Sequence, residues 1–477
     1  MKRVLNNPAH VVKLRPPGSP RLATVQQAPG QPAKPVRSAF VTPLVKPLAG
    51  LQATPPLSGL HKLGLFCFCG FLFSGYGNDL SIRLIGNKAY LSIVFGAVLP
   101  ILFLGCGTAL RGLQTSVGKC WAGFVLGLLC SGLFSMSRAE SLGMMEDYLP
   151  KIMIVFFYCC AFALTLRNCR TLIATSILCT SAILLSAALY GAPDVDGRFN
   201  IPDSMFFGNS NDLALSLICG LGFSLFLIWQ SSIFARILGT AEFLLALLFV
   251  LKTGSRGGFV ALSACLPVWF LFSNRRGRLL ALAIPAVCLL AVLPGAILSR
   301  LVEIAVPGTL TANAVSEDTS AASQFERTEL FKKSVRFAVT HPVFGTGPGT
   351  FMDALYFDDV ANSTHTAALG THNGYTQVAS ECGFPVFFLY VGVIVGSIRS
   401  SYRVVKRTRG VPGAENVLIM SLCLLGSLVA YAVGSAFDHV AFSMTLPVLS
   451  GITAALDLAS RGGDPQWIAT ETAAGNV

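Results

Sequence analysis

The sequence predicts an all-α, polytopic membrane protein with about 12 transmembrane helices and one large loop outside the membrane. Of its 477 residues, 53% are hydrophobic and only 12% are charged, whereas soluble proteins carry about 25% charged residues. Apolar runs recur along the chain, and each is long enough to cross a hydrocarbon core of roughly 30 Å as a helix. Helices are favoured because each one satisfies all of its backbone groups within a single segment. The alternating pattern of an outer-membrane barrel does not appear in the sequence.

Three regions follow from composition. Residues 1–57 hold eight Lys or Arg, eleven prolines and no acid, which predicts a disordered basic tail that cannot bury a core. Residues 58–460 form the predicted transmembrane domain, and 299–383 form its large loop. Residues 461–477 are predicted to be a short second tail.

The spans can be assigned from the apolar runs alone. They are predicted at about 59–76, 89–106, 119–136, 149–166, 171–190, 212–230, 236–252, 257–273, 279–298, 384–399, 415–435 and 440–459.

Basic residues concentrate on one side of these spans. They are Arg111, Lys119, Arg167, Arg170, Arg236, Arg275, Arg276, Arg278, Arg399, Arg403, Lys406, Arg407 and Arg409. The positive-inside rule makes this side cytoplasmic. Both termini are then cytoplasmic, and the 299–383 loop lies on the outer side.

The polar residues that could take part in catalysis or ligand binding fall on the predicted outer side. Lys252-Thr253-Gly254-Ser255-Arg256-Gly257-Gly258 joins two spans with almost no loop. Arg256 at a helix start is a candidate phosphate ligand, because the helix dipole and the guanidinium both favour an anion. The simpler interpretation is a tight turn whose Arg reaches out of the membrane.

A second polar loop precedes the span at 212–230. Arg198 in this loop is a candidate anion ligand, and it can instead pair with Asp194 or Asp196. Asn211 or Asp212 can cap the following helix. Asp194 and Asp196 resemble a weak metal-binding pattern, but no metal site is predicted.

The large loop holds the remaining candidates. Arg327 opens a stretch whose Leu330, Phe331, Val335 and Phe337 fit an amphipathic helix on the membrane surface. Residues 345–349 (Gly-Thr-Gly-Pro-Gly) can cradle an anion with backbone N–H groups, or form a plain turn.

His372, with Asn373 beside it, is the candidate for moving a proton near neutral pH. His341 and His365 are weaker candidates for the same role.

These motifs, in this order, resemble the O-antigen ligase and O-antigen polymerase superfamily of bacterial inner-membrane glycosyltransferases. The matching pieces are residues 253–257, Arg327 with the run 341–347, and His372-Asn373 before the Glu381-Cys382-Gly383 break, together with the span entry at Asn211. The resemblance covers residues 195–400 well and the rest by span count.

The resemblance implies the fold of the C-type membrane glycosyltransferases and a location in the bacterial inner membrane. It also implies transfer of a glycan from undecaprenyl pyrophosphate to an acceptor hydroxyl on the periplasmic face. The acceptor is lipid A core or a growing polysaccharide. Neither metal, cofactor nor nucleic acid is implied. Arg256, Arg327 and Arg198 would hold the pyrophosphate and His372 would act on the acceptor, with Ser255, Asn373 and Asn211 in support.

Two other functions compete with this one. A lipid-linked glycan transporter without catalysis would carry charged residues within its spans, and Glu242 is the main such residue in the sequence. A structural subunit acting through the basic tail leaves the outer Arg and His residues unexplained. The cysteines lie mostly in apolar runs, which favours packing over metal binding.

Overall fold

A computed structural model describes the backbone of residues 59–85, 91–194, 197–204, 206–273, 275–290, 314–362 and 370–461. All of these residues belong to the unit Gln52–Val477. The predicted tail at 1–57, the predicted tail after 461 and His365 lie outside the described residues.

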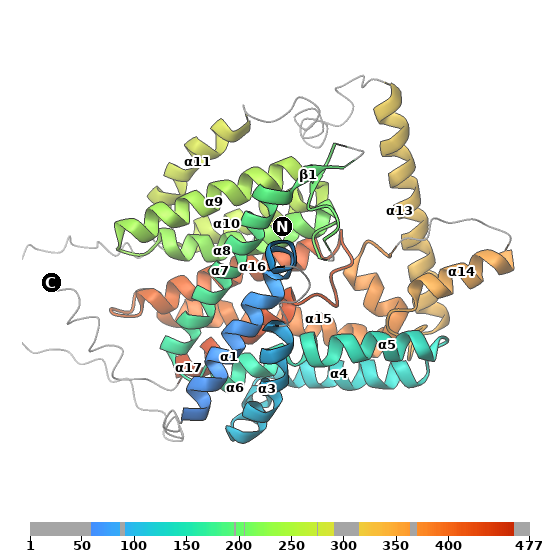
Figure 1. Ribbon diagram of the computed structural model, residues 1–477, viewed down its shortest axis with the longest axis horizontal. Coiled ribbons are helices and arrows are strands. Elements are labelled where there is room, and N and C mark those ends of the chain that lie inside the picture. Colours follow the sequence, from blue (N-terminus) through green and yellow to red (C-terminus); the bar gives the residue numbers. More distant parts are fainter. Residues whose placement is uncertain are drawn as a thin grey trace, which may run out of the picture. The chain divides into compact units, whose positions relative to one another are not determined.

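The described chain is helical, as predicted (Figure 1). Its first half contains α1 (Gly59–Tyr76), α2 (Asn78–Ile85), α3 (Leu91–Gly105), η1 (Ala109–Gln114), α4 (Ser116–Leu133), α5 (Arg138–Tyr148), η2 (Leu149–Met153), α6 (Val155–Phe162), α7 (Leu166–Tyr190) and α8 (Ser210–Ile228). Its second half contains α9 (Ile233–Thr253), α10 (Arg256–Phe272), α11 (Arg276–Leu290), α13 (Ala314–Thr340), α14 (Phe351–Asn362), α15 (Gly374–Thr408), α16 (Glu415–Gly434) and α17 (Thr445–Arg461). Two short strands, β1 (Ala192–Pro193) and β2 (Phe199–Asn200), pair within the loop before α8.

Every predicted span overlaps a helix. Six described helices, namely α4, α7, α8, α9, α15 and α16, are long and apolar enough to cross a membrane. The helical membrane fold is therefore confirmed, while the count of twelve spans and the side on which each loop lies stay predictions. Two boundaries differ from expectation, since α15 begins ten residues before the predicted span at 384 and α17 begins only at Thr445.

Side-chain caps fix several helix starts. Thr115, Thr165, Asn209 and Ser232 each accept a hydrogen bond from a backbone N–H in the first turn of the helix that follows. Such caps satisfy donors that have no partner within the helix. The cap of α8 is Asn209, which leaves the side chains of Asn211 and Asp212 available for other contacts.

Glycines allow the central helices to approach closely. α10 packs against α16, and a Cβ atom at Gly426 would lie 1.9 Å from Nε1 of Trp269. Trp269 is fully buried there. Small residues at helix crossings are typical of membrane bundles, where van der Waals packing drives association.

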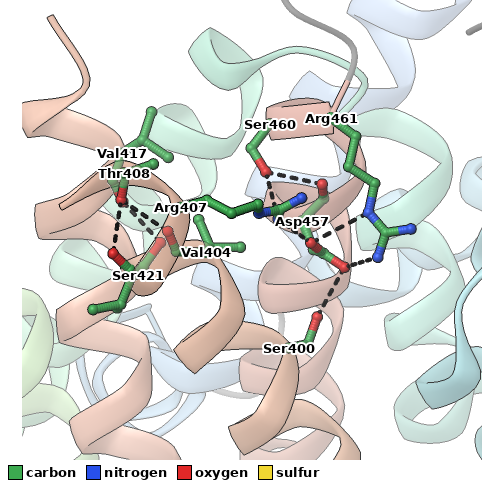
Figure 2. A network of polar contacts seen from close by, with 10 residues as sticks. Ser400, Val404, Arg407, Thr408, Val417, Ser421, Asp457, Ser460 and Arg461 are labelled. Atoms are coloured by element: carbon green, nitrogen blue, oxygen red, sulfur yellow. Dashed lines mark hydrogen bonds and ion pairs between the residues drawn. The ribbon is translucent and has the colours of Figure 1, made fainter. Parts of the chain in front are cut away.

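The basic loops gather at one end of the bundle. Arg170 of α7 donates to Gln230 after α8, and Arg275 forms an ion pair with Glu415 of α16. At the same end, the buried carboxylate of Asp457 accepts hydrogen bonds from Arg407, Arg461 and Ser400 (Figure 2). The contacts of Asp457 join the ends of α15 and α17 that lie farthest from His372.

The polar segment after residue 313 forms two helices, α13 and α14, which contact each other through a small apolar cluster and ion pairs. Leu330 and Phe337 of α13 are buried against Phe351, Ala354 and Leu355 of α14. Lys333 and Arg336 pair with Asp358 at 3.3 and 2.8 Å, and Lys333 also contacts Asp359. The predicted amphipathic face is thus divided, because Phe331 and Val335 remain exposed while Leu330 and Phe337 are covered.

Candidate functional site

Asn211 joins three segments at the end of the bundle opposite the basic loops. Its Oδ1 atom accepts hydrogen bonds from Arg198 at 2.7 Å and from Ser255 Oγ at 2.8 Å. Arg198 Nε also donates to the carbonyl of Thr253 at 3.2 Å. The Asp194 carboxylate accepts from the backbone N–H of Arg198, while the guanidinium turns to Asn211. Three candidates from the sequence, Arg198, Asn211 and Ser255, therefore form one hydrogen-bonded unit.

The turn between α9 and α10 positions Arg256. Gly254 ends α9 in the left-handed region, with φ of 57°, where glycine is favoured. Ser255 caps α10 by accepting from the N–H of Gly258. Arg256 is the first residue of α10 and is half-buried. Its side chain is therefore attached at the positive end of a helix dipole, as the sequence predicted.

His372 lies in the short segment that enters α15. Its φ is +49°, a conformation that is uncommon for a residue other than glycine. Asn373 caps α15 by accepting from the N–H groups of Tyr375 and Thr376. The N–H of Gly374 donates to the carbonyl of Ser435 at 2.7 Å, which ties this segment to the connection after α16.

The connection between α16 and α17 brings Asp438 and His439 to His372. The two histidine rings meet edge to face, with centroids 5.6 Å apart. Nδ1 of His439 lies 3.4 Å from Oδ1 of Asp438. Nδ1 of His372 and Oδ2 of Asp438 are buried without a hydrogen-bond partner among the described residues. The Asp212 carboxyl lies close to Asp438.

Positive charge surrounds this cluster. Burial, together with the positive charges of Arg327 and His439, lowers the pKa of His372 to about 4. Burial also lowers the pKa of Arg327, which interacts favourably with Asp438 and unfavourably with Arg256. The nearby Asp438 carboxylate raises the pKa of His439. At neutral pH the site therefore contains a neutral His372 beside several fixed cations.

The arrangement fits an anion well. Arg198, Arg256 and Arg327 are half-buried, so each can still face a ligand. Burying two arginines near each other is costly unless negative charge compensates them. Asp438 supplies part of that charge, and a bound anion would supply more.

A cation is also chemically conceivable at the same place. His372, Asp438 and His439 each offer one ligand atom, and these atoms lie within 4.8 Å of one another. Imidazole and carboxylate suit transition metals such as zinc. The neighbouring arginines oppose a cation, so we continue to expect a site that works without metal.

The Gly-rich turn at 345–349 has a structural role. The N–H groups of Thr346 and Gly347 donate to the carbonyls of Ser380 and Glu381, and that of Gly349 donates to Glu381 Oε2 at 2.8 Å. These groups hold the connection between α13 and α14 against α15, where α15 kinks at Gly383, with φ of 80°. The donors are already used, so this segment is a plain turn, which was one of the two sequence interpretations.

Sequence reasoning missed Asp212, Asp438 and His439 as members of the site. Asp212 was considered only as a helix cap, and Asp438 and His439 were not chosen as candidates. A signal was present, because the predicted topology puts the connection 436–439 on the same outer side as His372. Two adjacent polar residues in a short connection between apolar segments can indicate a functional site, as a long polar loop can.

A comparison with known families agrees with the resemblance drawn from the motifs. A family model described as O-Antigen ligase matches residues 241–391. The matched range contains Arg256, Arg327 and His372, whereas Arg198, Asn211, Asp438 and His439 lie outside it. The chain matches none of the curated proteins.

Proposed function

We propose that this chain, a member of the O-antigen ligase and polymerase superfamily by its match over residues 241–391, is a membrane glycosyltransferase. It transfers a glycan from undecaprenyl pyrophosphate to an acceptor hydroxyl on the periplasmic face of the inner membrane. The acceptor is lipid A core or a growing polysaccharide chain. The single observation that carries the proposal is the proximity of a neutral His372 to Arg327, which in turn lies near Arg256, at one end of an apolar helical bundle.

The arginines suit the leaving group. Breaking the bond between the sugar and the pyrophosphate leaves negative charge on a phosphate oxygen. Fixed guanidinium groups stabilise such charge through bidentate hydrogen bonds that need no reorganisation during the reaction. In this proposal Arg256 and Arg327 contact the pyrophosphate. Arg198, whose guanidinium is bonded to Asn211 and Thr253, borders the same site.

His372 suits the acceptor. A sugar hydroxyl is a weak nucleophile and gains from a base within hydrogen-bonding reach. The acceptor oxygen attacks the anomeric carbon, the bond to the pyrophosphate oxygen breaks, and the hydroxyl proton passes to the imidazole of His372. Attack opposite the leaving group inverts the anomeric centre. The bound pyrophosphate offsets the charge of Arg327, which raises the pKa of His372 and makes it a stronger base when donor is present.

Substitution of the two arginines tests this function. We expect Arg256→Ala and Arg327→Ala to impair transfer strongly at matched protein levels. Lys at either position should restore little activity, because a point charge does not reproduce the planar fork of Arg. Transfer by the unsubstituted enzyme should also survive a metal chelator. Normal product from either Ala variant would remove that arginine from the site.

One observation favours a transporter as the second candidate. Glu242 lies near the middle of α9, is 6% exposed, and accepts a hydrogen bond from Ser181 of α7 at 3.0 Å. Glu242 is thus a buried carboxyl within a helix that is long and apolar enough to span a membrane. Buried carboxyls within spans are common in transport pathways. Purified protein in vesicles separates the two functions, because an enzyme releases polyprenyl pyrophosphate in proportion to product while a transporter leaves the glycan attached to its lipid.

A further inference from the structure

α13 presents two exposed flanks of opposite character. One flank, called here the apolar flank, consists of Phe331, Val335 and Val339, which are 47%, 39% and 64% exposed. The other, the polar flank, consists of the exposed residues Lys332, Arg336 and Thr340. Residues four apart lie on one side of a helix, so each set forms a continuous stripe.

The rest of the helix is covered by protein. Leu330, Ser334, Phe337 and Ala338 are buried, with α14 and α15 packed against α13. The apolar flank therefore borders the face that packs on the bundle and has no described protein segment over it. Three exposed apolar side chains in a row are unusual in a segment that otherwise carries Lys, Arg and Glu.

The apolar flank continues onto helices that are candidates to cross the membrane. It leads to Val343 and Phe344 in the turn after α13, and Phe344 stacks on Phe134 at the end of α4 with ring centroids 4.3 Å apart. Pro342 in this turn accepts a hydrogen bond from the N–H of Phe384 in α15, one turn before the exposed Phe388. α4 and α15 both have the length and composition of spans, so their exposed apolar side chains face lipid.

The direction of α13 agrees with this continuity. In Figure 1, α13 runs across the direction shared by α4 and α15, rather than along it. A helix that crosses the ends of spans lies along the membrane surface. Its buried side then faces the bundle, and a flank beside that side meets the bilayer next to the bundle.

We propose that the apolar flank of α13 is buried in the bilayer at the boundary between headgroups and acyl chains, so that α13 is an interfacial helix. Such helices place apolar residues several ångströms below the headgroups and keep basic residues on the opposite, wetter flank. Lys332 and Arg336 occupy that flank here. Arg327 precedes Phe331 by one turn, so its guanidinium lies at headgroup depth. If the proposed function also holds, this is the depth at which the pyrophosphate of a lipid-borne donor arrives.

Tryptophan fluorescence in bilayers tests the lipid contact without relying on activity. Val335→Trp and Val339→Trp report from the apolar flank. Lys332→Trp and Thr340→Trp are the controls on the polar flank, since Lys332 lies three residues before Val335 and Thr340 directly follows Val339. Each variant is reconstituted in vesicles whose lipids carry bromine on the acyl chains. The chain has four native tryptophans. Trp121, Trp229 and Trp269 are buried and Trp467 lies outside the described residues, so the signal of the unsubstituted protein is subtracted.

Bromine should quench the apolar-flank tryptophans, and aqueous iodide should quench the polar-flank controls. The proposal is overturned if iodide quenches both flanks while bromine quenches neither, because the apolar flank then faces water or awaits another partner. Val339 is the most exposed position of the flank, so Val339→Trp decides the matter if Val335→Trp does not fold. The quenching pattern does not depend on catalysis, so a failure here and a failure of the proposed function are distinguishable.

Discussion

The ring of His372 meets the ring of His439 edge to face, with centroids 5.6 Å apart, although 67 residues separate the two in sequence. His372 enters α15 and His439 follows α16, so the pair links the two connections on which the candidate site depends. Asp438 is buried beside both rings, and Arg327 reaches the same cluster from α13. The chemistry proposed here rests on this convergence.

The pH dependence of transfer should respond to Arg327. Burial, Arg327 and His439 hold the pKa of His372 at about 4 in the free protein, and a base must be unprotonated to act. Activity should therefore fall only as the pH approaches this low value. Arg327→Gln removes one cause of the low pKa, so His372 should protonate at a higher pH and the acid limb of kcat/KM should move upward.

The comparison uses relative profiles, because Arg327→Gln also weakens donor binding. Lys332→Gln is the matched control, since this exposed residue lies on the polar flank of α13 and pairs with Glu329. An acid limb that stays in place in Arg327→Gln would show that His372 does not set the pH dependence.

Asn211 should matter for the geometry of the site. Its Oδ1 is the shared acceptor for Arg198 and Ser255. Removing a buried acceptor leaves its donors unsatisfied at a cost of about 1–3 kcal/mol. We expect Asn211→Ala to lower both the melting temperature and transfer. Asn362→Ala, at an exposed amide near the end of α14, should leave both unchanged, and an unaffected Asn211→Ala would show that this unit is dispensable.

Much of the fold could be predicted from the sequence, because apolar runs and helix length follow from the bilayer itself. Arg256 could be chosen because it lies at the boundary of two apolar runs. Arg327 and His372 could be chosen because they lie in the one long polar loop, within motifs that resemble the family. The roles of Asp438 and Asp212 could not, since a single carboxyl near a span end has the same local sequence whether it caps a helix or faces a histidine. The divided faces of α13 were also hidden, because periodicity does not reveal that α14 covers one of them.

The ion-pair network around Asp457, called here the clamp, should affect stability without affecting glycan transfer. It lies at the end of the bundle opposite His372. Asp457 is buried and binds Arg407, Arg461 and Ser400 (Figure 2). Asp457→Asn removes the charge that these arginines share, and we expect a loss of about 1–3 kcal/mol in the free energy of unfolding. Glu415→Gln breaks an exposed pair with Arg275 and should cost at most about 1 kcal/mol.

Thermal unfolding in detergent measures both variants, and transfer per folded molecule should stay close to normal in each. Equal melting temperatures for Asp457→Asn and the unsubstituted protein would mean that the clamp contributes little to stability.

The central claim is that His372 activates the acceptor while the arginines hold a lipid pyrophosphate donor. The most direct measurement quantifies lipid-linked donor and glycan product in the same cells, at matched protein levels, for His372→Ala and for the control His341→Ala, whose ring is exposed beside Thr340. Loss of a general base typically slows a reaction by about a hundred- to ten-thousand-fold. The account predicts that His372→Ala accumulates donor and makes almost no product, while His341→Ala makes normal product. Normal product from His372→Ala would contradict it.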